Sequence, residues 1–115
     1  MMVKGGQPLM MGAFANKTGV SEPQPMPGGD TFGWSQRVKV DMPALKEYAK
    51  AVFAATDEYV GGLSDEELDR KMQFGQMGEQ SVSSVLTLIT IVHPSNHIGE
   101  VSALKGIDGA KGYPF

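Results

Sequence analysis

The sequence predicts an all-α protein that folds as a single domain. Three observations support this fold class: apolar residues recur at helical spacing after a start signal at Asp41-Met42-Pro43, a capping box begins at Ser64, and a later apolar segment carries two histidines four residues apart. A length of 115 residues allows one modest core. We expect a long helix over residues 42–60, a short helix over 65–72 and a long, kinked helix over 80–105.

The helix over 42–60 has the clearest signals. Asp41 is a suitable N-cap, Pro43 falls in the first turn where its missing N–H costs nothing, and Gly61-Gly62 follows as a stop. One apolar stripe is formed by Leu45, Tyr48, Val52, Ala55 and Tyr59, and it is widened by Ala49, Phe53 and Thr56.

The short helix follows Ser64-Asp65-Glu66-Glu67, in which the Ser64 hydroxyl and the Glu67 carboxylate are spaced to cap the first turn reciprocally. Gly75 and Gly78 then mark a loop.

Two interpretations compete for the segment that follows. Residues 85–92 are rich in Val, Ile and Thr, which suits a buried strand ended by Pro94. We favour a helix, because at 100° per residue one arc of about 80° holds both histidines and the apolar stripe. The members of this arc are Val82, Leu86, Ile89, His93, His97, Glu100 and Leu104. Both imidazoles are therefore expected to face the interior, and Pro94 to kink the helix at a cost of about 3 kcal/mol.

Residues 1–40 form an irregular segment, since glycines and prolines recur too often for a long regular element. We expect it to pack on the helices through its large apolar side chains; the alternative is a disordered tail over 1–30. These anchors are Met1, Met2, Leu9, Met10, Met11, Phe14, Phe32 and Trp34.

Composition excludes several functions. The net charge is −3 with no run of Lys or Arg, which argues against nucleic acid or an anionic membrane as partner. No cysteine is present, so any thiol must come with a substrate. We find no signal peptide and no membrane span, and expect a cytoplasmic protein.

His93 and His97 are candidate metal ligands. Four helical residues turn about 400° and rise about 6 Å, so both rings can reach one ion at about 2.0–2.1 Å. The alternative is that they are ordinary surface or packing residues. Imidazole suits zinc, nickel or iron alike.

Other ligands are harder to assign. Glu100 shares the arc but lies about 10 Å along the axis from His93, so we expect it to support a metal ligand or to form a salt bridge instead of binding the same ion. Asp57 and Glu58 are weak candidates for a third ligand and are more readily explained as solvated residues near a helix end.

Two motifs stand near the C-terminus: His93-x-x-x-His97-x-Gly99-Glu100-Val101, and Ala103-Leu104-Lys105-Gly106-Ile107-x-Gly109-Ala110-Lys111-Gly112-Tyr113-Pro114-Phe115. They resemble the C-terminal signature of the DinB-like superfamily of metal-binding four-helix bundles, which includes YfiT-type proteins and mycothiol- or bacillithiol-dependent enzymes. The resemblance extends over roughly residues 30–115.

The resemblance implies a partial DinB-like bundle whose first helices are missing. In that family three histidines hold the metal; only His93 and His97 carry over, because the chain has no third histidine. It further implies a metal-dependent thiol transferase or hydrolase acting on a small thiol or another small molecule. The alternative is a non-catalytic structural or interaction protein that keeps the fold without a working site.

We also expect a homodimer, since two long helices cannot bury all apolar faces of the last one. The rival explanation is a truncated product that folds poorly alone.

Overall fold

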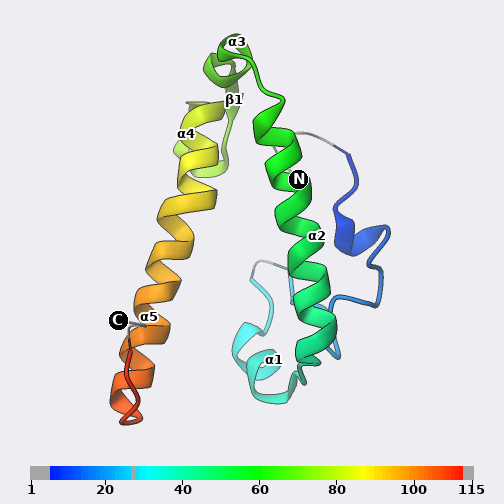
Figure 1. The fold of residues 1–115 in the computed structure, drawn as a ribbon, viewed down its shortest axis with the longest axis vertical. Coiled ribbons are helices and arrows are strands. Elements are labelled where there is room, and N and C mark those ends of the chain that lie inside the picture. The colour runs from blue at the N-terminus through cyan, green and yellow to red at the C-terminus, as the bar shows by residue number, and fades with distance from the viewer. Residues whose placement is uncertain (1–5, 27, 113–115) are drawn as a thin grey trace. The chain divides into compact units, whose positions relative to one another are not determined.

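The computed structural model describes residues 6–26 and 28–112, and the chain divides into two compact units, Met1–Gly62 and Leu63–Phe115. Each unit is described by itself. The predicted helical character is confirmed at a coarse level, although two short strands are also present (Figure 1). The expected single domain, with residues 1–40 packed on 41–115, stays a prediction. The expected anchors Met1 and Met2, and the apolar end Tyr113-Pro114-Phe115, lie outside the described residues.

The main element of the first unit is α2 (Met42–Gly61). Its start follows the sequence signal, because the Asp41 side chain accepts a hydrogen bond from the backbone N–H of Ala44 at 3.2 Å. The five residues of the predicted stripe are half-buried. Phe53, predicted to widen that stripe, is 67% exposed, so this part of the prediction is wrong.

The segment before α2 is less irregular than predicted. It contains a short turn, η1 (Leu9–Met11), and a helix, α1 (Thr31–Arg37), whose first turn is capped by Asp30 Oδ1 accepting from the N–H of Gly33 at 2.7 Å. The ring of Phe14 packs on that of Tyr48 in α2 with centroids 5.3 Å apart. The segment is thus fastened to α2 by one of its predicted aromatic anchors.

Gly19 occupies the tightest point of the first unit. Val20 and Val40 form an antiparallel bridge, and the Gly19 carbonyl accepts from the N–H of Asp41 at 2.7 Å. The backbone of Gly19 has φ +86°, and a Cβ there would lie 2.7 Å from the Leu45 Cα and 2.8 Å from the Asp41 carbonyl oxygen. Only glycine satisfies both requirements.

The second unit begins with α3 (Asp65–Asp69), which carries the predicted capping box. The helix is shorter than the predicted 65–72, because the chain becomes extended at Arg70 and pairs as a hairpin. Strand β1 (Lys71–Gln73) pairs antiparallel with β2 (Glu79–Ser81) across a turn, η2 (Gly75–Met77). The predicted glycine loop is therefore the turn of this hairpin.

The last helical rod starts at Val82 rather than at residue 80, because residues 79–81 belong to β2. It consists of α4 (Val82–Thr87), η3 (Leu88–Val92) and α5 (His93–Ile107), which follow one another without a break (Figure 1). The helix is thus confirmed over the strand alternative. Val82, Val85 and Leu86 are buried, and each such side chain contributes about 1.5–3 kcal/mol.

The rod passes Pro94 by means of a π-helical turn. Pro94 lies in the first turn of α5 and cannot donate a backbone hydrogen bond. The preceding five residues, η3, form the π-turn, the usual form of a one-residue insertion in a helix. On either side of Pro94 a hydroxyl donates to a backbone carbonyl: Thr90 to Leu86 and Ser95 to Ile91, each at 2.7 Å.

The end of α5 explains two glycines of the C-terminal motif, Gly109 and Gly112. Gly109 has φ +76°, and the N–H of Ala110 returns to the carbonyl of Lys105 at 2.8 Å, which closes the helix. A Cβ on Gly112 would lie 2.6 Å from the carbonyl oxygen of Ser102, so the chain runs back against α5 (Figure 1). Among the described residues, no helix is long and apolar enough to cross a bilayer.

We predict that Gly19→Ala lowers the free energy of unfolding by more than about 2 kcal/mol, since it adds a clash to backbone strain. The matched control is Gly28→Ala, because Gly28 has φ +88° and an added Cβ there would meet no atom within 4 Å, which isolates the strain. Denaturant unfolding checks this, and equal losses in both variants would contradict the packing argument.

We also predict a pH-dependent contribution from the capping box. The pKa of Glu67 lies below its ordinary value of 4.5, chiefly because its carboxylate accepts from the Ser64 backbone N–H and then from the Ser64 hydroxyl. A lowered folded-state pKa stabilises the fold above the unfolded pKa, and this contribution disappears as the pH falls through the folded value. Unfolding measured from neutral to acidic pH should show a shallower loss in Glu67→Gln than in wild type. Parallel slopes in the two proteins would refute the argument.

Candidate metal centre

His93 and His97 occupy the start of α5 and lie on one face of it, as their spacing predicts. Their Nε2 atoms are 3.1 Å apart, and their ring centroids are separated by 4.5 Å with an interplanar angle of 82°. The two Nε2 atoms are within hydrogen-bond distance, so one of them must carry the proton of the hydrogen bond between the rings.

Glu100 fixes the orientation of the second ring. Its Oε2 lies 2.8 Å from Nδ1 of His97, one turn further along α5. A carboxylate can only accept, so the Nδ1–H of His97 donates to Glu100, and in the neutral ring Nε2 keeps its lone pair. Nε2 of His97 then accepts from Nε2–H of His93. Glu100 thus contacts the ring edge that faces away from the pair, as expected for a supporting group.

The pair fits a divalent ion. Two nitrogens that bind one ion at about 2.0–2.1 Å lie about 3.3–3.4 Å apart in a tetrahedral site. The observed 3.1 Å is within a few tenths of an ångström of that separation. To bind an ion, His93 would take its Nδ1–H tautomer, which frees the lone pair of its Nε2, while the contact of Glu100 with Nδ1 of His97 would be unaffected.

Within the second unit, the expectation that the imidazoles face the interior is wrong. Both histidines are exposed, and the His97 and Glu100 side chains are 57% and 68% exposed. Two causes combine within the second unit. The π-turn adds a residue, so the buried stripe of Val82 and Leu86 does not continue in phase into α5. The hairpin, moreover, reaches the helix only as far as Val92.

No third ligand joins the pair among the described residues, where no group of three or more His, Cys, Asp or Glu side chains is arranged to hold an ion. The weak candidates Asp57 and Glu58 lie exposed on α2 in the first unit. Within the described chain the site is therefore a two-nitrogen site with one supporting carboxylate.

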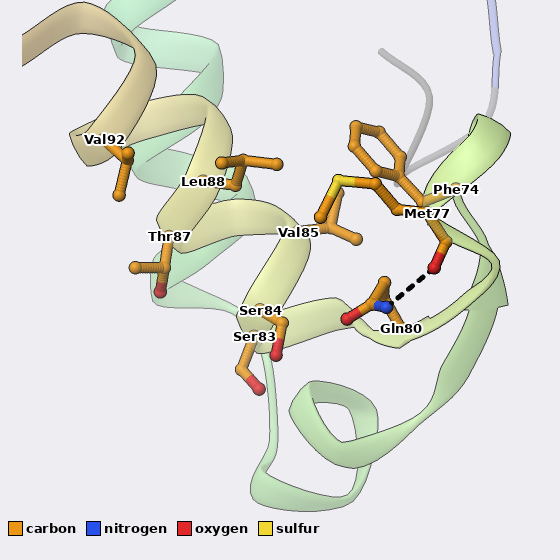
Figure 2. A pocket seen from close by; sticks show the side chains of 9 residues that line it. All are labelled: Phe74, Met77, Gln80, Ser83, Ser84, Val85, Thr87, Leu88 and Val92. Atoms are coloured by element: carbon orange, nitrogen blue, oxygen red, sulfur yellow. Dashed lines mark hydrogen bonds between the residues drawn. The ribbon is translucent and has the colours of Figure 1, made fainter. Parts of the chain in front are cut away.

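A groove of about 420 Å³ lies beside the same rod, between the hairpin and the helix. Figure 2 shows Phe74 and Met77 of the hairpin facing Val85 and Leu88 of the helix, with Gln80 held by a hydrogen bond from its Nε2 to the Met77 carbonyl at 3.0 Å. The remaining lining residues are Ser83, Ser84, Thr87 and Val92. None of the lining side chains is charged, so the groove suits an apolar group and carries no acid–base chemistry.

The sequence prediction does not include this groove, because the glycines of residues 75–78 indicate only a plain loop. The available signal is the placement of Phe74 and Met77 around Gly75, since large apolar side chains in a tight turn usually have something to cover. Val92 ends the groove and directly precedes His93, but the histidines do not line it.

Comparison of the chain with protein-family models, with curated proteins and with solved structures finds no match.

We predict that Glu100→Ala changes the tautomer of His97. Removing the acceptor should reduce the population of the Nδ1–H form of the neutral ring about two- to five-fold, the range for an exposed charged contact. Nitrogen-15 NMR of the imidazole reports the tautomer directly. Asn96→Ala, which removes an exposed neighbour outside this contact, should leave the spectrum unchanged. An unchanged spectrum in Glu100→Ala as well would mean that the contact is absent in solution.

Proposed function

We propose that this protein binds a divalent metal ion, such as zinc, nickel or iron, through Nε2 of His93 and Nε2 of His97. The observation that carries the proposal is the 3.1 Å separation of these two atoms, together with the Glu100 carboxylate placed behind His97. This arrangement directs a lone pair of His97 toward the position that an ion would occupy.

The resemblance to DinB-like proteins adds support to the same proposal. We propose that the chain has a DinB-like helical fold, in which His93 and His97 are the two histidines of the His-x-x-x-His motif. A metal bound here would supply Lewis acidity toward a thiol or water. The protein's own contribution is to hold two imidazoles on one helical turn and to fix the His97 ring through Glu100. On this basis the reaction class is a thiol transfer or a hydrolysis of a small molecule.

A second candidate function is a non-catalytic interaction protein. It is favoured by the exposure of α5, on which Ile98 and Leu104 are 61% and 64% exposed despite their apolar character. Exposed apolar side chains that form one continuous patch mark interaction sites. Both candidates are compatible with a homodimer, which we propose in either case.

The test is metal content. Wild type, His97→Ala and the control Asn96→Ala are purified without chelators, dialysed against zinc and analysed by mass spectrometry of the metal. Wild type and control should retain zinc, whereas His97→Ala should bind it at least about ten-fold more weakly, since two ligands become one. Equal zinc retention in all three proteins would remove the metal proposal and leave the interaction protein.

A further inference from the structure

The turn of α5 that carries the two histidines is built from weak helix formers. From His93 to Gly99 the residues are His, Pro, Ser, Asn, His, Ile and Gly. None of them belongs to the residue types with the highest helix propensity, and proline and glycine have the lowest. Local propensity therefore opposes the helix at the point where the metal pair lies.

The backbone of this turn also lacks a hydrogen bond. Pro94 has no N–H to donate to the carbonyl of Thr90. Directly before it, the N–H of His93 donates to the carbonyl of Leu88, five residues back, as in a π-turn. His93 precedes Pro94 and His97 follows it, so a link between the two imidazoles spans this weak point.

We infer that a metal ion bound by His93 and His97 clamps the turn of α5 that contains Pro94, so that bound metal sets how often this turn opens. The inference rests on the proposed metal binding and not on the proposed reaction.

The first argument is the geometry of the pair. In the helical turn the two Nε2 atoms are 3.1 Å apart, close to the separation of about 3.3–3.4 Å that one tetrahedral ion requires. The helical turn can therefore bind the ion without a change in its backbone. An opened turn must first re-form before both rings reach one ion, so the ion binds the helical turn more tightly than the opened one.

The second argument is what the ion replaces. The rings are joined by a single hydrogen bond between His93 Nε2 and His97 Nε2, and an ion would replace it with two coordination bonds. Glu100 would continue to accept from Nδ1 of His97. A ligand that binds only the helical turn reduces the population of opened turns about 100-fold when its free concentration is about one hundred times its Kd.

The experiment is amide hydrogen exchange of the full chain, followed by NMR with and without zinc chloride. In an α-helix the N–H groups of residues 97–101 donate to the carbonyls of residues 93–97, so these amides exchange when the turn opens. With zinc at about one hundred times its Kd, they should exchange about 100-fold more slowly. The amides of α2, which lies in the other unit, should keep their rate.

Matched controls tie the slower exchange to the pair. His97→Ala should lose the effect of zinc, whereas Asn96→Ala, in the same turn, should keep it. Magnesium chloride at the same concentration should have no effect in wild type, because magnesium prefers oxygen ligands.

Pro94→Ala tests the weak point itself. This change restores the missing donor and introduces a strong helix former. Without zinc, the amides of residues 97–101 should exchange at least about ten-fold more slowly in Pro94→Ala than in wild type. An unchanged rate would overturn the assignment of Pro94 as the weak point of the helix.

The outcomes separate the clamp from the proposed metal binding. Zinc that is retained without slowing the exchange of residues 97–101 overturns the clamp, while metal binding stands. Equal slowing in α2 also overturns it, because zinc would then stabilise the whole chain and not one turn. No retained zinc overturns both.

Discussion

The continuity of the last helix past Pro94 is the constraint on which the candidate site depends. Pro94 cannot donate to a carbonyl of the previous turn, and a normal α-helix would have to bend or break there. The chain instead makes a π-turn over Leu88–Val92, with the hydroxyls of Thr90 and Ser95 bonded to nearby carbonyls. The helix continues, and the two histidines lie on consecutive turns of α5, directly after the π-turn.

Local signals in the sequence are sufficient for the two helices that follow Asp41 and Ser64, but not for the hairpin. Asp41 and Ser64 indicate helix starts, because an N-cap bonds to a backbone N–H only three residues further along the chain. Such a short spacing can be read from the sequence. The strand pairing of Lys71 with Ser81 depends on residues ten positions apart, and neither three-residue strand carries a visible alternation. Helix α1 is absent from the prediction because Gly33 weakens the signal that Asp30 provides as a cap.

The same distinction applies to the candidate site: contacts within one helix can be predicted from the sequence, whereas the direction of that helix face cannot. The contact between His93 and His97, and the approach of Glu100 to His97, follow from spacings of four and three residues on one helix. The direction in which the imidazoles face depends on the phase between α5 and the buried turn of Val85, and a helical wheel at constant 100° has no means of registering the extra residue of a π-turn. Local geometry is therefore predictable from the sequence, and orientation is not.

The direction in which the two histidines face is therefore set separately from the contacts that they make with each other. Gain or loss of one residue between Leu88 and Val92 would rotate all following residues by about 100° around the helix axis. The contacts among His93, His97 and Glu100 would stay the same, because these residues lie on one helix after that point. The length of this one segment therefore sets whether the histidine pair lies on the buried or the exposed side of the helix, without any change in the pair itself.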